Sequence, residues 1–229
     1  MAIKLKSTKD YSANGVKVLV YGRAGVGKTT LCATAPNPII ISAEAGLLSI
    51  AGKDIPTIEI HNIDELFEAY EFICSEDCKK LGIQTVCLDS ISEIAEQCLA
   101  EEKKKNKDGR KAYAETSDRM AAILRTFRDI PDKNIVFIAK QDKVQDDQSA
   151  LHYGPSMPGN KFAQGMGYFF DEVFALNIGE DEDGTYRYIQ TQPDTLYEAK
   201  DRSGALNDVE KADLTYIFDK IKGVTENED

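Results

Sequence analysis

Short apolar runs alternate along the chain with segments whose apolar residues recur at helical spacing. The apolar runs predict strands at residues 16–21, 38–42, 57–60, 84–89 and 135–139. Helices are expected at residues 30–35, after an N-cap at Asn62, from Ser92 toward a lysine-rich stretch, and at residues 116–129. Because strands and helices alternate, we expect an α/β fold with a mostly parallel sheet flanked by helices.

The last third of the sequence has a different pattern. Residues 143–167 are rich in Gly, Pro, Ser, Asn and Gln, which predicts a long functional loop or a loose hairpin. Residues 171–178, 185–192 and 196–199 predict a C-terminal antiparallel meander, whose first turn lies at residues 181–184. Asp208 is expected to cap a closing amphipathic helix that extends to Ile221.

The 229 residues contain no long linker, so we expect one domain at residues 15–222, an N-terminal tail at 1–14 and an acidic C-terminal tail at 223–229. No apolar run approaches the roughly 20 residues of a membrane-spanning helix, and the N-terminus has no apolar secretion segment. The five scattered cysteines favour buried reduced thiols over a zinc site. These features predict a cytoplasmic protein without a membrane partner.

The charge of the chain is acidic overall but unevenly distributed. A net charge of −11 argues against a nucleic-acid binder, yet a basic block lies at residues 103–111. A local patch of this kind can bind phosphate even on an acidic protein, and the alternative is a solvated helix end and loop. The basic residues of the block are Lys103, Lys104, Lys105, Lys107, Arg110 and Lys111.

Residues 22–29, Gly-Arg-Ala-Gly-Val-Gly-Lys-Thr, match the P-loop pattern G-x-x-x-x-G-K-[ST]. A predicted strand precedes them and a predicted helix follows, which is the context in which this pattern binds phosphate, through converging backbone N–H groups and the helix dipole. Lys28 is expected to reach the β- and γ-phosphates of ATP, and the Thr29 hydroxyl to bind Mg²⁺. The residues expected to cradle the nucleotide are Gly22, Arg23, Ala24, Gly25, Val26, Gly27, Lys28, Thr29 and Thr30.

Two carboxylates follow predicted strands. Asp89 ends an apolar strand, where a P-loop ATPase needs an acid to position Mg²⁺; the alternative is an ordinary cap for the next helix. Glu44 follows the second strand, where a carboxylate points into the ligand crevice of a parallel sheet. It can act as the base for the attacking water, or it can be a helix-capping residue.

Two pairs of polar residues follow later strands. Lys140 and Gln141 end the strand that starts at Ile135, where a polar group can sense the γ-phosphate. Lys200 and Arg202 are spaced i, i+2 on an extended segment and therefore point to one face. This pair suits an arginine finger that acts on the ATP of a neighbouring molecule, and the alternative is a surface turn with ordinary charges.

The order of these motifs resembles that of the RecA-like ATPases over residues 15–205. The resemblance rests on the P-loop, on Ser42-Ala43-Glu44, on Leu88-Asp89-Ser90 and on residues 137–140. Residues 158–162 resemble the Gly-Asn element of the second DNA-binding loop of RecA, and residues 199–204 resemble the K-x-R finger motif of KaiC and DnaB-type helicases. The chain looks most similar to the small phage ATPases of the Sak type, which are single-strand annealing proteins of phage recombination.

The resemblance implies a role for each of these residues. Glu44 becomes the catalytic glutamate, Asp89 the Walker B acid, Lys140 or Gln141 the sensor, and Lys200 with Arg202 a pair that acts in trans. The sequence departs from RecA in placing Lys140 where RecA has its sensing Gln. We also expect no counterpart of the RecA polymerisation helix or of its C-terminal DNA domain.

The resemblance also implies two DNA-binding segments, residues 103–113 and 145–166. Aromatic side chains there can stack on bases, and Tyr113 is one of them. Outside the basic block, the expected contacts to single-stranded DNA are Tyr153, Asn160, Lys161 and Phe162.

The sequence thus predicts an oligomeric ATPase with ATP and Mg²⁺ as cofactors, which binds single-stranded DNA and promotes annealing or recombination in the host cytoplasm of a phage. One alternative is a small-molecule or nucleoside kinase, but such enzymes need an arginine-lined lid, and the arginines here are few and scattered. Another is a module in which ATP switches assembly with a partner such as a helicase or a single-strand binding protein, docked through the acidic tail.

Overall fold

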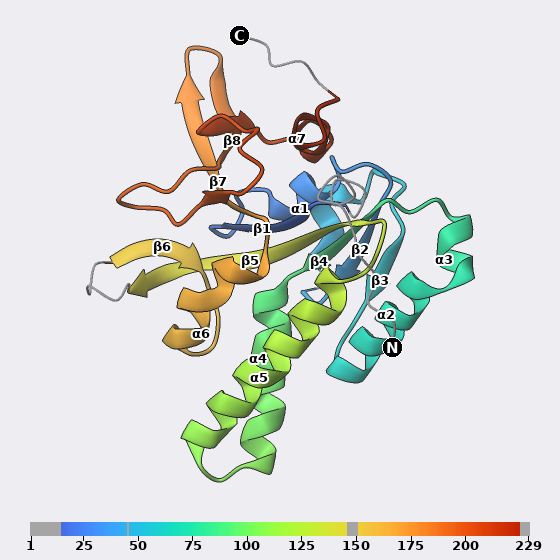
Figure 1. Cartoon of the computed structure of the whole chain (residues 1–229), viewed down its shortest axis with the longest axis vertical. Helices are drawn as coiled ribbons and strands as arrows, with labels where there is room; N and C mark the ends of the chain where they lie inside the picture. The colour runs from blue at the N-terminus through green and yellow to red at the C-terminus, as the bar shows by residue number, and fades with distance from the viewer. Residues whose placement is uncertain (1–14, 45, 146–150, 225–229) are drawn as a thin grey trace, which may run out of the picture.

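The computed structural model describes residues 15–44, 46–145 and 151–224. It confirms the expected α/β fold, in which a mostly parallel sheet is covered by helices on both faces and continues into antiparallel strands at its C-terminal end (Figure 1). The strands are β1 (Lys17–Gly22), β2 (Pro38–Ser42), β3 (Thr57–Glu59), β4 (Thr85–Asp89), β5 (Asn134–Gln145), β6 (Leu151–Pro155), β7 (Glu172–Asp181), β8 (Gly184–Gln190), β9 (Lys200–Asp201) and β10 (Val209–Lys211). The α-helices are α1 (Lys28–Cys32), α2 (Ile63–Cys74), α3 (Glu76–Lys80), α4 (Ile91–Lys105), α5 (Gly109–Arg128), α6 (Asn160–Gly165) and α7 (Leu214–Ile221), and short 3₁₀ helices are η2 (Leu47–Ile50) and η3 (Met166–Phe169).

The parallel core of the sheet has the strand order β7-β1-β5-β4-β2-β3. The carboxyl ends of these strands therefore lie at one edge. The P-loop strand β1 and the strand β4 that ends at Asp89 are not neighbours, because β5 lies between them. Gly22 pairs with Lys140, and Asp89 pairs with both Ser42 and Ile138. The order and register bring the ends of β1, β2, β4 and β5 together at the edge where ligands bind in such sheets.

Alternate residues of the buried strands point to opposite faces of the sheet, and each face has its own core. On one face, Leu19, Val86 and Phe137 pack with side chains of α2, α4 and α5. On the other face, Val20 and Ile138 pack with side chains of α1 and α7. The continuous apolar runs in the sequence reflect this burial on both faces.

Side-chain caps fix where several helices begin. Asn62 accepts a hydrogen bond from the Glu65 backbone N–H at the start of α2, as predicted. Ser90 caps α4 in the same way. Asp108 caps α5, which therefore begins at Gly109 rather than at residue 116. Thr116, which was predicted to start the helix, lies inside it. Its hydroxyl donates a hydrogen bond to the Ala112 carbonyl oxygen one turn earlier.

Two predictions in the last third are wrong. Residues 196–199 form no strand, because the Asp194 side chain accepts hydrogen bonds from the Leu196 and Tyr197 backbones and turns the chain. The third strand of the meander is instead β10, which pairs with β8. Asp208 caps no helix, because residues 209–211 are taken up by β10, and Asp213 caps α7 through the Tyr216 backbone N–H.

The predicted hairpin after residue 143 and the predicted turn at residues 181–184 are confirmed. The stretch from residue 143 contains the end of β5 and its hairpin partner β6, followed by α6. The turn predicted at residues 181–184 joins β7 to β8. The predicted tails are residues 1–14 and 223–229, and of these the structure describes only residues 223 and 224. Within the described residues, no helix combines the length and the apolar character needed to cross a bilayer.

Candidate functional site

A cavity of about 550 Å³ lies at the carboxyl edge of the parallel strands. Its lining combines the P-loop with polar side chains that follow β2, β4 and β5, together with one arginine from β8. The lining residues are Gly22, Ala24, Gly25, Gly27, Lys28, Thr29, Thr30, Glu44, Gly46, Ser49, Asp89, Lys140, Gln141 and Arg187. Most residues that were predicted to contact the nucleotide, the metal ion and the γ-phosphate thus line one cavity.

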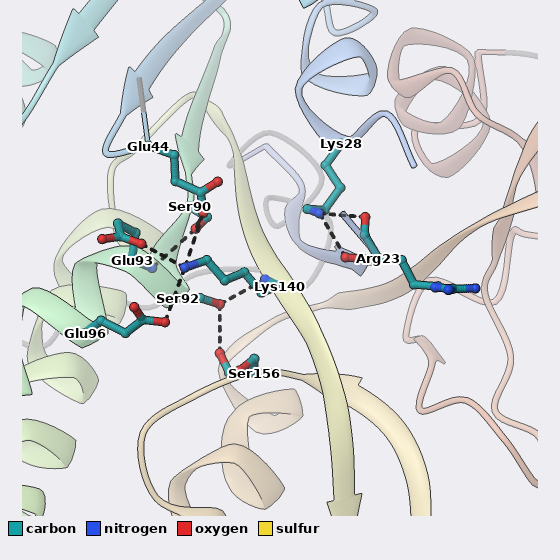
Figure 2. A network of polar contacts seen from close by, with 10 residues as sticks. Arg23, Lys28, Glu44, Ser90, Ser92, Glu93, Glu96, Lys140 and Ser156 are labelled. Carbon is teal, nitrogen blue, oxygen red and sulfur yellow. Dashed lines mark hydrogen bonds and ion pairs between the residues drawn. The ribbon is translucent and has the colours of Figure 1, made fainter. Parts of the chain in front are cut away.

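The P-loop has the backbone that phosphate binding requires. Gly25 and Gly27 have φ angles of 76° and 102°, which glycine adopts readily and residues with a Cβ atom rarely adopt. The Lys28 ammonium donates to the carbonyl oxygens of Gly22 and Arg23, at 2.9 Å and 3.1 Å, and so lies across the loop (Figure 2). Burial lowers the pKa of Lys28, and the nearby carboxylates Asp89 and Glu44 only partly oppose this shift.

Two of the predicted cradle residues do not line the cavity. The Val26 side chain is buried in the core beside α1. The Arg23 side chain points away from Lys28 and Glu44 (Figure 2) and lines a neighbouring hollow with Tyr188 and Tyr197. Their backbones remain part of the loop, because Arg23 and Val26 both offer carbonyl oxygens to side chains around it.

Thr29 and Asp89, the two residues predicted to bind Mg²⁺, lie side by side in the structure. The Thr29 hydroxyl donates to the Asp89 carboxylate at 2.6 Å, although the two residues are 60 positions apart in the chain. Burial raises the pKa of Asp89, the Thr29 hydrogen bond opposes the shift, and Glu44 adds to it. Two hard oxygen donors side by side fit a Mg²⁺ ion whose remaining ligands are phosphate oxygens and water.

Glu44 is held at the cavity by Ser90, a residue for which no contact with Glu44 was predicted. The Ser90 hydroxyl donates to the Glu44 carboxylate and accepts a hydrogen bond from the Glu93 backbone N–H (Figure 2). Ser90 is fully buried, whereas about a third of the Glu44 side chain is exposed. One carboxylate oxygen of Glu44 therefore has a fixed partner, and the side chain faces the cavity in which an attacking water would lie.

Lys140 lies at the centre of a network that joins the cavity to α4 (Figure 2). Its ammonium contacts Glu93 at 2.8 Å and Glu96 at 3.3 Å, and Glu44 is 4.0 Å away. Burial lowers the pKa of Lys140, but the hydrogen bonds to Glu93 and Glu96 outweigh it and leave the pKa above its usual value. The Lys140 ammonium therefore lies within reach of both the cavity and the first turns of α4.

The backbone around Lys140 belongs to the same network. The Lys140 backbone N–H donates to the Ser92 hydroxyl, which donates in turn to the Ser156 carbonyl oxygen just after β6. The next residue, Gln141, lines the cavity, and its buried side-chain oxygen has no hydrogen-bond partner among the described residues. Both predicted sensor residues thus lie where β5 passes from the sheet into the β5–β6 hairpin.

Arg187 also lines the cavity, although no sequence motif predicts it there. It lies on β8, where its strand was predicted but its side chain was given no role. Its Nε donates to the Val26 carbonyl oxygen at 2.7 Å, so a residue 161 positions away contacts the P-loop. Only the pairing of β8 with β7, and of β7 with β1, brings it there.

Lys200 and Arg202 lie far from the P-loop of their own chain. Lys200 pairs with Val173 in the first half of β7, and Arg202 lines a hollow with Lys17 at the amino edge of the sheet. The Lys200 ammonium donates to the carbonyl oxygens of Gly167 and Phe170, and Arg202 forms an ion pair with Asp171 at 2.9 Å. The Arg202 side chain remains 56% exposed.

The basic block lies at the tip of the α4–α5 helical hairpin, which projects from the sheet in Figure 1. Its six basic residues are all exposed. Lys103 lies over the ring of Tyr113, itself 41% exposed. A Cβ placed on Gly159 would lie 3.7 Å from the Tyr113 ring. The two predicted nucleic-acid segments therefore meet beside Tyr113.

Two aromatic residues of the second segment, Tyr153 and Phe162, pack against other aromatic rings of the same chain. The Tyr153 ring packs against Tyr197 at 5.3 Å between centroids, and the Phe162 ring packs against Phe169 at 6.1 Å. Both side chains are partly buried against the core, so Tyr113 is better exposed for base stacking. Lys161 is exposed, and the side chain of Asn160 lies outside the described residues.

A protein-family model described as an AAA domain matches residues 14–203. No curated protein matches the chain. Among solved structures, the chain is similar to the KaiC-like protein PH0186 from the hyperthermophilic archaeon Pyrococcus horikoshii OT3, with 15% sequence identity, 77% of each chain covered and a TM-score of 0.44. The family match extends from the start of the described domain through Lys200 and Arg202.

Proposed function

The chain belongs to the AAA domain family, and from that premise we propose that it is a Mg²⁺-dependent ATPase that binds single-stranded DNA. The observation that supports ATP hydrolysis is the convergence of Lys28, the Thr29–Asp89 pair and Glu44 on one cavity. Backbone N–H groups of the P-loop and Lys28 bind the phosphates, and Thr29 with Asp89 holds Mg²⁺, which neutralises charge on the transferred phosphate. Glu44 accepts a proton from the attacking water.

The exposed tip of the α4–α5 hairpin supports the choice of nucleic acid. Six exposed basic side chains lie at this tip, Lys103 lies over the Tyr113 ring, and Gly159 lies beside the same ring. Basic side chains that track a phosphate backbone, combined with an aromatic platform, are the features of single-strand binding sites. We propose single-stranded DNA as the polymer and annealing of complementary strands as the outcome, as in the phage ATPases that the sequence resembles.

Lys140 supplies a route between the nucleotide and the DNA. Its ammonium contacts Glu93 and Glu96 of α4. A γ-phosphate in the cavity competes for this ammonium, so Lys140 turns from α4 toward the nucleotide when ATP binds. The far end of α4 carries Lys103, Lys104 and Lys105, so the exchange of partners links ATP binding to the DNA-binding tip.

ATPase assays with and without single-stranded DNA test this proposal. Wild-type protein should hydrolyse ATP in the presence of Mg²⁺, and DNA should stimulate the rate. Lys28→Ala should lose ATP binding in an equilibrium titration with a fluorescent ATP analogue. Glu44→Gln should retain ATP binding and lose turnover by roughly 10²–10⁴, the usual contribution of a positioned base.

Three results would contradict the proposal. Wild-type ATP affinity in folded Lys28→Ala would remove the P-loop assignment. Unchanged turnover in Glu44→Gln would make Glu44 a structural residue. Transfer of phosphate to a small acceptor, without stimulation by DNA, would identify a kinase instead.

A further inference from the structure

Arg187 lies against the P-loop at Val26 and Gly27. Its Nε donates to the Val26 carbonyl oxygen at 2.7 Å. The side chain also packs against Gly27, because a Cβ on that glycine would lie 2.4 Å from the Arg187 Nε and 3.1 Å from its Cζ. The guanidinium is therefore fixed against the phosphate-binding backbone itself, and it belongs to the same chain.

Arg187 also lies at the junction of two cavities. It lines the cavity of about 550 Å³ that contains the P-loop, and it also lines a second groove of about 360 Å³ that runs beside α1. The two cavities share Gly27, Thr30 and Arg187. The groove is closed on its other side by the turn from β10 to α7, at residues 211–213.

The position along the P-loop indicates which part of a nucleotide meets this arginine. Backbone N–H groups of the loop cradle the α- and β-phosphates, whereas the lysine reaches the β- and γ-phosphates. Lys140, Glu44 and Asp89 surround the end of the cavity near Lys28. Arg187 is in contact with Gly27, on the side where the cavity continues into the groove.

We propose that Arg187 binds the α- and β-phosphates of the nucleotide in cis, and that the groove beside α1 receives the nucleoside. A guanidinium has five N–H donors, and one of them, on Nε, bonds Val26. The donors on the two terminal nitrogens can bind phosphate oxygens, in the planar geometry that suits arginine. This inference rests on the proposed nucleotide binding and deepens it, because it assigns a cis arginine in addition to the pair expected to act in trans.

Titration of ATP and ADP into Arg187→Gln tests the inference. Glutamine can still donate a hydrogen bond toward the Val26 carbonyl oxygen but carries no charge. Affinity for ATP and for ADP should fall by a similar factor of about 10–100, the range for a hydrogen bond to a charged group. Arg187→Lys should recover part of the affinity, and the thermal midpoint without nucleotide should remain that of the wild type in both variants.

Arg128→Gln is the matched control, because Arg128 lies at the amino edge of the sheet and pairs with its neighbour Asp129. It should bind both nucleotides as the wild type does. Equal amounts of Arg187→Gln and Lys28→Ala, mixed and co-assembled, should show no sites of wild-type affinity, because both residues serve the site of their own chain.

Some results overturn the inference while the proposed function stands. If Lys28→Ala loses binding and Arg187→Gln does not, Arg187 only supports the loop. If Arg187→Gln loses affinity for ATP but not for ADP, its contact is to the γ-phosphate and the assignment is wrong. Recovery of wild-type sites in the mixture would place Arg187 in trans. If Lys28→Ala keeps wild-type affinity, the P-loop assignment itself fails.

Discussion

Ser90 connects the stability of α4 to the chemistry proposed for Glu44. Its hydroxyl accepts the Glu93 backbone N–H as a helix cap and donates to the Glu44 carboxylate. Most helix caps affect stability alone. The Ser90 hydroxyl also orients Glu44, the candidate base. Its removal should therefore lower turnover as well as stability, whereas removal of an ordinary cap should lower stability alone.

Ser90→Ala should therefore lower turnover strongly and lower the free energy of unfolding only by the amount expected for the loss of a cap. We expect the maximal ATPase rate to fall by about 10–100-fold, because a misplaced catalytic group costs this much. ATP affinity should be retained, and unfolding free energy should fall by about 1 kcal/mol, as for other caps. Steady-state kinetics and denaturant titration measure these quantities.

Ser75→Ala is the control for Ser90→Ala. Ser75 caps α3 through the Cys78 backbone N–H and has no contact with the candidate site. It should lose a similar amount of stability and keep its turnover. Equal turnover in the two variants would show that Ser90 acts only as a cap.

The residues that line the cavity were predictable from the sequence where they belong to the P-loop or directly follow a buried strand. The P-loop pattern identifies Lys28 and Thr29, and a carboxylate after an apolar strand identifies Asp89. Arg187 belongs to no such motif, and its neighbour in space, Gly27, is 160 positions away in the chain. The turn at residues 181–184 predicts the pairing of β8 with β7, but nothing in the sequence around Arg187 encodes the pairing of β7 with β1 that brings Arg187 to the P-loop.

At the scale of elements, periodic apolar patterns were sufficient for the buried strands and for the first helices. They failed where one pattern supports two structures. Val209 and Ala212 fit one face of a helix that starts at Asp208, yet residues 209–211 pair with β8 as a strand. The choice depends on an open edge of β8, which exists only in the folded sheet.

The tip of the α4–α5 hairpin makes a prediction at this scale. Neutralising Lys103, Lys104, Lys105 and Lys107 together by substitution with Gln should weaken binding to single-stranded DNA. The slope of log affinity against log salt should become shallower by up to about 3, since each lost phosphate contact contributes about 0.7 on single strands. Fluorescence anisotropy at several salt concentrations measures the slope.

A second set of four exposed lysines serves as the control, at Lys53, Lys79, Lys80 and Lys222. Their replacement with Gln changes the net charge by the same amount but leaves the hairpin tip intact. This variant should keep the wild-type slope within about 0.7. If the two variants behave alike, the effect comes from overall charge, and the basic block is a solvated helix end.

At the scale of the whole molecule, the nucleotide cavity and the Lys200–Arg202 pair lie at opposite edges of the sheet. The cavity lies at the carboxyl edge, and Arg202 lies near Lys17 at the amino edge. A chain with this arrangement cannot bring Arg202 to its own P-loop without unfolding β9 from β7. If the pair takes part in hydrolysis, it does so at the cavity of a neighbouring molecule, and ATPase activity then depends on assembly.

Mixing two inactive variants tests this dependence. Arg202→Ala keeps its own cavity and lacks the finger, whereas Lys28→Ala lacks the cavity and keeps the finger. Arg202→Ala should be nearly inactive alone, because an arginine finger contributes roughly 10³–10⁵ in rate. Lys28→Ala should be nearly inactive alone because it should not bind ATP. Mixed at equal amounts, they should recover partial activity at interfaces where an intact cavity meets an intact Arg202.

Specific activity of the wild type should also rise with protein concentration, because assembly supplies the finger. If the mixed variants recover no activity despite confirmed co-assembly, the role of Arg202 is limited to its ion pair with Asp171.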